Sequence, residues 1–222
     1  MALAKTTRPT SVAAIARPRL FNLLDRLQRR PVTWVWAPPG AGKTVLIASY
    51  LATRKLNHLW FQVDDGDSDL SSFFYFLGLA ASKRRRAMLL LTPEFRQNLG
   101  VFTRNFFREL YSRLKTPFTI VFDNYQEVPA EAELNQIMPA ALAELPEEGR
   151  AIFVSRNEPP PSCAKLRADQ AVELLDYSEI RFTEPEAAEL IHKLSRCRTW
   201  WGARESGALE PGKRHGRLDR RR

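Results

Sequence analysis

Short apolar runs alternate with longer amphipathic segments along most of the chain. Five of these runs have the length and the β-branched or aromatic content of buried strands: Val32–Ala37, His58–Val63, Phe118–Asp123, Ala151–Ser155 and Ala171–Leu175. Near-continuous apolar strands separated by helices are typical of a parallel sheet that helices cover on both faces. We therefore expect an α/β domain with a five-stranded, mainly parallel sheet between helices.

The segments between these runs show the spacing of helices. Residues 93–115 read as one long helix, with Leu99, Phe102 and Phe106 on one side. Thr183 is placed to cap a further helix, because an acidic first turn follows it. The other helical segments are residues 45–55, 70–82 and 132–145.

The composition changes after Ser195. Ordering the 27 residues from 196 to 222 costs about 40 kcal/mol, at about 1.5 kcal/mol for each residue. Burying the four large apolar side chains of this segment returns roughly 10 kcal/mol. We therefore expect residues 1–30 to lead into the fold, residues 31–195 to form the α/β domain, and residues 196–222 to be a disordered basic tail.

The net charge of +9 first suggests a nucleic-acid partner. Residues 196–222 contain nine Lys or Arg and three Asp or Glu, so six of the nine net charges lie there. Such a tail binds nucleic acid without sequence specificity and weakly at high salt, so we expect no sequence-specific DNA binding.

No apolar run approaches the roughly 18 residues of a membrane helix, and no secretory signal opens the chain. Cys163 and Cys197 have no metal-site spacing, so we expect a cytoplasmic protein with reduced thiols and no membrane partner.

The segment "APPGAGKT" after the first strand has the pattern of a phosphate-binding loop. Gly40 and Gly42 let the backbone turn so that successive N–H groups point at phosphate oxygens. The helix that begins near Gly42 adds its positive end, Lys43 reaches the β- and γ-phosphates, and the Thr44 hydroxyl ligates Mg²⁺. The predicted nucleotide-binding residues are Pro39, Gly40, Ala41, Gly42, Lys43, Thr44 and Val45.

Two residues at later strand ends complete this prediction. Asp123 ends the apolar run "TIVFD", where its carboxylate would hold Mg²⁺ through water opposite Thr44. Arg156 follows the run "AIFVS" and would sense the γ-phosphate at the carboxyl edge of the sheet. Taken alone, a strand-end aspartate that caps a turn and a surface arginine are the simpler interpretations; the phosphate-binding loop favours the functional ones.

Other patterns favour structural interpretations. The acidic run from Asp64 to Asp69 lacks the Gly and Glu positions of a calcium loop and predicts a solvated turn. The basic run from Lys83 to Arg86 predicts an exposed loop, since no groove-reading helix accompanies it. Ser155 lacks the partners of a serine nucleophile.

With these motifs together, the chain resembles the STAND-type P-loop ATPase domain of large LuxR-type bacterial transcriptional regulators, the maltose-regulator-like group. The resemblance covers roughly residues 12–194 in the family's order. The matching segments are "IARPRLFNLLDRL", "APPGAGKT", "LWFQVDDGDSD", "IVFDNYQEV", "FVSRNEPP" and "EIRFTEPEAAEL".

The resemblance implies an ATPase core whose Arg156 strand lies between the Lys43 and Asp123 strands. It also implies an ATP/ADP switch that controls self-association, with Arg17 or Arg19 near the adenine. The family has a second aspartate after Asp123, which this chain replaces with Asn124. An amide orients water but accepts no proton at neutral pH, so we expect ATP binding with slow or absent hydrolysis. Asp123, Asn124 and Arg156 are the predicted catalytic positions, and Glu127 is an open alternative as base.

The second departure from the family is length. Such regulators continue into winged-helix, sensor and DNA-binding segments, and the chain stops before them, which predicts a truncated or frameshifted product. Two other interpretations stay open. An AAA-like ATPase motor would hydrolyse ATP strongly and respond to nucleic acid, whereas a non-functional fragment would bind no nucleotide.

Overall fold

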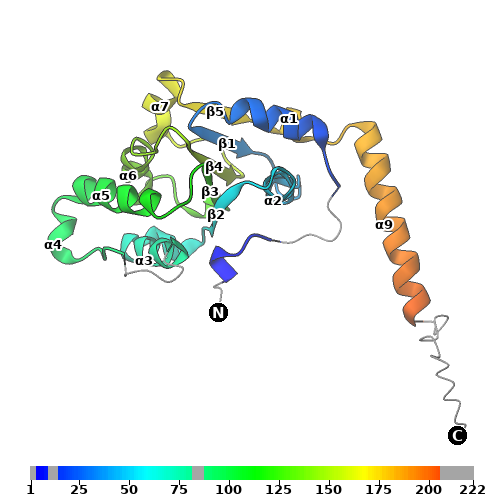
Figure 1. Cartoon of the computed structure of the whole chain (residues 1–222), viewed down its shortest axis with the longest axis horizontal. Coiled ribbons are helices and arrows are strands. Elements are labelled where there is room, and N and C mark those ends of the chain that lie inside the picture. The colour runs from blue at the N-terminus through cyan, green and yellow to red at the C-terminus, as the bar shows by residue number, and fades with distance from the viewer. Residues whose placement is uncertain (1–3, 10–14, 82–87, 206–222) are drawn as a thin grey trace, which may run out of the picture. The chain divides into compact units, whose positions relative to one another are not determined.

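Five strands form one sheet in the order β2-β3-β4-β1-β5, and every pairing is parallel (Figure 1). The computed structural model describes residues 4–9, 15–81 and 88–205. The strands are β1 (Val32–Trp36), β2 (Asn57–Gln62), β3 (Phe118–Asp123), β4 (Gly149–Ser155) and β5 (Val172–Leu175). The α/β fold with a five-stranded parallel sheet, expected from the apolar runs, is confirmed.

Nine α-helices and four short 3₁₀ helices are present among the described residues. The α-helices are α1 (Pro18–Leu27), α2 (Lys43–Arg54), α3 (Leu70–Ala81), α4 (Pro93–Arg96), α5 (Leu99–Ser112), α6 (Glu133–Leu142), α7 (Ala164–Ala168), α8 (Tyr177–Ile180) and α9 (Glu184–Glu205). The 3₁₀ helices are η1 (Ala4–Thr6), η2 (Asp65–Ser68), η3 (Tyr125–Glu127) and η4 (Pro161–Cys163). In this part of the chain, no helix combines the length and apolarity needed to cross a membrane.

Helices cover both faces of the sheet (Figure 1). On one face, α3, α5 and α6 pack against strand side chains that include Trp34 and Phe153, whose rings stack at 4.8 Å. On the other face, α1, α2 and α8 pack against Val35 and Val154. Successive side chains of a strand point to opposite faces, so a strand covered on both sides needs apolar residues throughout. This explains the continuous apolar runs in the sequence.

The carboxyl ends of β1, β4 and β3 lie side by side. Trp36 pairs with Ser155, and Phe122 pairs with Phe153, so β4 separates the other two strands. The resemblance implied this arrangement, and the strand order confirms it. In a parallel sheet this edge is where ligands bind. The loop after β1, Asp123 and Arg156 therefore meet at one edge.

The long helix predicted for residues 93–115 is two helices, α4 and α5. Asn98 breaks the run with φ −136°, outside the helical range, and its carbonyl accepts the first hydrogen bonds of α5. Asparagine favours such a boundary position because its short polar side chain competes with helical hydrogen bonding. Apolar periodicity alone could not reveal the break.

The last helix runs past the predicted end of the domain. The chain divides into two units, residues 1–181 and residues 182–222, and α9 in the second unit continues to Glu205. The first ten residues of the predicted tail are thus helical, and residues 206–222 lie outside the described residues. Extending an existing helix by a residue costs little, and no proline interrupts the chain between Pro185 and Pro211. Helix cooperativity therefore orders residues that a per-residue entropy cost predicts to be disordered.

The sequence predicted a solvated turn after β2, and this is wrong for one residue: Asp67 is completely buried. Its Oδ2 atom accepts a hydrogen bond from the Asp64 N–H at 2.9 Å and lies 2.8 Å from Nζ of Lys5. Lys5 also lies 2.8 Å from the Asp64 carboxylate and over the rings of Phe61 and Phe76. A cation near the start of the chain therefore stabilises a buried carboxylate sixty residues later. The basic run at residues 83–86 lies outside the described residues.

Candidate nucleotide-binding site

The loop between β1 and α2 has the backbone geometry of a phosphate-binding loop. Gly40 and Gly42 both have φ +79°, in the left-handed region that side chains disfavour. Gly42 directly precedes the helix, and its carbonyl accepts the Leu46 N–H at 2.8 Å. The amino end of a twelve-residue helix thus faces the loop, and its free N–H groups and dipole favour an anion there.

Lys43 crosses this loop. Its Nζ atom donates to the carbonyl of Ala37 at 2.6 Å and to that of Pro38 at 3.0 Å. Burial and the nearby positive charge of Arg156 lower the pKa of the Lys43 ammonium, and Asp123 partly offsets both effects. A buried cation held only by neutral carbonyls gains more from phosphate oxygens, because they accept hydrogen bonds and carry negative charge. Lys43 is therefore suited to anion binding.

Thr44 and Asp123 face each other across the site. The Thr44 hydroxyl donates to Oδ1 of Asp123 at 2.9 Å, and the N–H of Asn124 donates to the same oxygen at 3.1 Å. Asp123 is 2% exposed, and this burial raises the pKa of its carboxyl, with partial compensation by the hydrogen bonds from Thr44 and Asn124. Hydroxyl and carboxylate oxygens are the ligands that Mg²⁺ prefers, so this pair suits a magnesium ion.

Asn124 and Glu127 lie just beyond this pair. Asn124 has φ +60° and ψ +35°, a conformation that asparagine tolerates better than most residues. This turn begins η3, where Gln126 donates through Nε2 to Oε1 of Glu127 at 3.1 Å. Glu127 is exposed, and its carboxylate is bound to Gln126. The open alternative that Glu127 activates water has no further support from these contacts.

Arg156 lies at the same edge, directly after β4. Its side chain is exposed and close enough to Lys43 to lower the pKa of that ammonium. Its backbone N–H donates to Oε1 of Gln126 at 3.1 Å. The structure therefore brings together the loop, Asp123 and Arg156, as the sequence predicted, and adds Gln126. Nothing in the spacing of the sequence distinguishes Gln126 from other polar residues.

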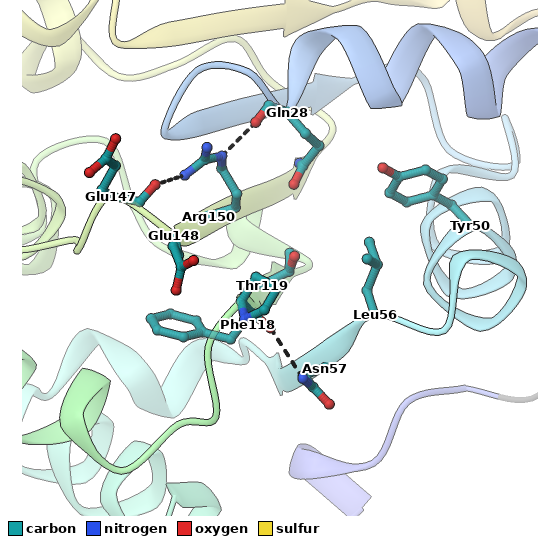
Figure 2. Close-up of a pocket in the computed structure, with 10 residues that line it drawn as sticks. Gln28, Tyr50, Leu56, Asn57, Phe118, Thr119, Glu147, Glu148 and Arg150 are labelled. Carbon is teal, nitrogen blue, oxygen red and sulfur yellow. Dashed lines mark hydrogen bonds between the residues drawn. The ribbon is translucent and has the colours of Figure 1, made fainter.

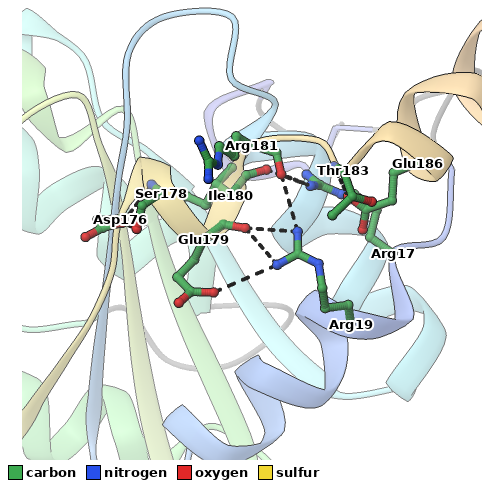
Figure 3. Close-up of polar contacts among 9 residues, drawn as sticks. All are labelled: Arg17, Arg19, Asp176, Ser178, Glu179, Ile180, Arg181, Thr183 and Glu186. Carbon is green, nitrogen blue, oxygen red and sulfur yellow. Dashed lines mark hydrogen bonds and ion pairs between the residues drawn. The ribbon is translucent and has the colours of Figure 1, made fainter.

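Arg17 and Arg19 contact the segment after β5 (Figure 3). Nη2 of Arg17 donates to the carbonyls of Ile180 at 2.6 Å and Arg181 at 3.0 Å. Both Nη atoms of Arg19 donate to the carbonyl of Glu179 at 3.0 Å. These hydrogen bonds connect the start of α1 to α8. Contact of either arginine with adenine stays a prediction.

One cavity adjoins the site, and a larger one lies away from it. The smaller, about 270 Å³, adjoins Gln126, Ser155 and Asn157 at the carboxyl edge. The larger, about 610 Å³, lies at the opposite edge of the sheet, among Asn57, Thr119 and Arg150 at the starts of three strands (Figure 2). The sequence predicted neither cavity, because each is formed by residues from several distant segments.

Comparison with known proteins gives the chain a family context. The HTH-type transcriptional regulator MalT of Vibrio parahaemolyticus is 27% identical over 168 residues, which are 73% of this chain and 18% of that protein. MalT of Yersinia pestis is 28% identical over 192 residues, or 83% of this chain and 21% of that protein. This chain is related to the MalT-type regulators. It spans about a fifth of the length of the curated relatives it matches. No protein-family model matches it.

Two solved structures show a weak likeness to the chain. A STAND protein with a tetratricopeptide repeat sensor from Pyrococcus horikoshii aligns with a TM-score of 0.41 and 13% identity, over 78% of this chain and 24% of that one. The Orc1 protein of Aeropyrum pernix, solved in complex with DNA, aligns with a TM-score of 0.45 and 15% identity, over 81% and 48%. The assignment to the P-loop NTPase fold depends on the strand order and the loop geometry.

Proposed function

We propose that this MalT-related chain is an ATP-binding switch domain of a bacterial transcriptional regulator, with slow or no ATP hydrolysis. The observation that carries the proposal is the arrangement at the carboxyl edge. A glycine turn with two positive φ angles, a buried lysine and a threonine–aspartate pair converge there. Each group suits a different part of a magnesium-bound triphosphate. The backbone amides and the lysine suit the phosphates, and the threonine and aspartate oxygens suit the cation.

The residues have separate roles in this proposal. Backbone N–H groups from Pro39 onward and the start of α2 surround the β-phosphate, and Lys43 exchanges its bonds to Ala37 and Pro38 for phosphate oxygens. Thr44 and Asp123 hold the Mg²⁺ ion, which neutralises phosphate charge when bound. Arg156 contacts the γ-phosphate, so it distinguishes ATP from ADP.

Slow hydrolysis follows from the chemistry next to Asp123. Asn124 is an amide and accepts no proton from water near neutral pH. Glu127, the alternative base, is hydrogen-bonded to Gln126. Robust magnesium-dependent phosphate release from the purified chain, lost in a Lys43→Ala variant, would contradict this part of the proposal and leave nucleotide binding intact.

Titration with a fluorescent ATP analogue, with and without Mg²⁺, tests the function. We expect binding that Lys43→Ala weakens by about 10- to 100-fold, because a charge-assisted contact is lost. The matched control is Lys165→Ala, which removes an exposed lysine from α7. DNA-stimulated turnover would favour an ATPase motor instead. Absence of binding would favour a non-functional fragment.

The switch itself is tested by assembly state. If ATP and ADP control self-association, light scattering should give different masses for the chain in the two nucleotides at the same concentration. Equal masses with both nucleotides, together with normal binding, would remove the self-association part of the proposal.

A further inference from the structure

We propose that Gln126 is a positioning residue that holds Arg156 in place for the γ-phosphate, so that its loss reduces the preference for ATP over ADP. This inference depends on the nucleotide-binding function proposed above. Gln126 lies three residues after Asp123, and its side chain reaches the loop that carries Arg156. It thus connects the magnesium side of the site to the γ-phosphate side.

The hydrogen bonds of Gln126 use both ends of its amide. Oε1 accepts the Arg156 N–H, and Nε2 donates to Glu127, each at 3.1 Å. Only a side-chain amide of this length offers an acceptor and a donor together in a neutral group. The Nε2 bond fixes the orientation of the amide, because it leaves Oε1 facing Arg156.

The sheet does not hold this part of the two loops together. Pairing between β3 and β4 ends at Phe122 and Phe153, short of both Gln126 and Arg156. The side chain of Gln126 continues the connection from that point. It does so beside the cavity of about 270 Å³, whose lining includes Gln126 and Asn157. On the other side of β4, pairing with β1 reaches Ser155, and Nε1 of Trp34 donates to the Asn157 carbonyl, so the Gln126 bond is what ties Arg156 to the loop after β3.

The Arg156 guanidinium is exposed and makes no hydrogen bond or ion pair with any of the described residues. Its position relative to Lys43 is therefore set by its backbone. The backbone N–H is the atom that Gln126 binds. A shift of this backbone would weaken contact with the γ-phosphate, which ATP has and ADP lacks.

The experiment compares the affinities of fluorescent ATP and ADP analogues, in Mg²⁺, for the full chain and four variants. Gln126→Met keeps the side-chain length and removes both hydrogen bonds. Gln62→Met makes the same change at an exposed residue at the end of β2, beside Asp123 in the sheet, and serves as the matched control. Arg156→Ala and the double variant Gln126→Met/Arg156→Ala complete a cycle.

We expect Gln126→Met to weaken ATP binding by about 3- to 10-fold, the usual worth of one hydrogen bond, with ADP affinity and the thermal midpoint unchanged. The double variant should bind ATP no more weakly than Arg156→Ala alone, because Gln126 acts through Arg156. Equal losses for ATP and ADP, no loss, or independent losses in the double variant would each overturn the inference. Those outcomes leave the proposed function standing, whereas an unmodified chain that binds neither nucleotide overturns both.

Discussion

An arginine lies near each end of β4, and the two have opposite surroundings. Arg150, the second residue of the strand, donates to the carbonyls of Gln28 and Glu147 (Figure 2) and to that of Gly149. Arg156, just past the carboxyl edge, has an exposed guanidinium close enough to Lys43 to affect its pKa. One arginine is satisfied by backbone acceptors and the other has donors available to a ligand.

The comparison shows that the larger cavity is not the one beside the proposed nucleotide site. The cavity beside Arg150 is about 610 Å³ and the one beside Gln126 about 270 Å³. Yet the backbone turn, the buried lysine and the carboxylate that suit a nucleotide all lie at the carboxyl edge. The hydrogen-bonding groups that a ligand can use are therefore a better guide to a binding site than the volume of the cavity. Four variants test how strictly this separation of structural and binding groups holds.

Lys5→Met should have the largest effect on the free energy of unfolding. It tests whether a lysine near the carboxyl edge serves the stability of the fold and not ligand binding. Removing Lys5 leaves the buried Asp67 carboxylate without its counter-charge, so we expect a loss of about 3 kcal/mol in the free energy of unfolding. Urea denaturation measures it.

The pH dependence gives a check on the Lys5 variant. Burial raises the pKa of Asp67, so its ionised form is the costly one in the fold. The loss should therefore be largest above the raised pKa and shrink as the pH falls through it, when the carboxyl protonates. A loss that does not vary with pH would contradict the ionic explanation.

Arg150→Ala should lower the free energy of unfolding by about 2 kcal/mol, because three carbonyls lose their donor in a half-buried place. ATP affinity should stay within about twofold, since the residue lies at the far edge. Denaturation and nucleotide titration on the same preparation measure both. A stable variant with impaired ATP binding would break the comparison.

Arg156→Ala should have the opposite profile. We expect ATP affinity to fall about tenfold, or about 1.4 kcal/mol, with ADP affinity unchanged. The free energy of unfolding should change by less than about 0.5 kcal/mol, because the side chain is exposed. Equal weakening of ATP and ADP would place Arg156 away from the γ-phosphate.

Asp123→Asn should stabilise the nucleotide-free protein, raising its free energy of unfolding by about 1 kcal/mol at neutral pH. Burial raises the pKa of Asp123, so its charged form destabilises the nucleotide-free fold above that pKa. The stability gained by the variant should disappear as the pH falls and Asp123 protonates. Thermal midpoints of both proteins from about pH 5 to about pH 8 measure this, and loss of the magnesium dependence of ATP binding shows the cost in function.

The fold and the central site were accessible from the sequence for different reasons. Buried strands leave continuous apolar runs, and Gly40 and Gly42 are the residues that tolerate a positive φ. Asp67 shows the limit of such reasoning. A run of aspartates predicts solvation, and only the approach of Lys5 from the start of the chain makes its burial favourable.

Sequence patterns alone were enough to predict the α/β class, the strands and the glycine turn after β1, because these depend on short-range rules: side-chain periodicity, glycine conformation and the residues at strand ends. Only the tertiary structure decided which arginines serve the scaffold, where Lys5 finds its partners, and that Gln126 reaches Arg156. These are single hydrogen bonds and ion pairs between residues 30 to 163 positions apart. Their energies depend on distances of a few ångströms, which local sequence patterns do not encode.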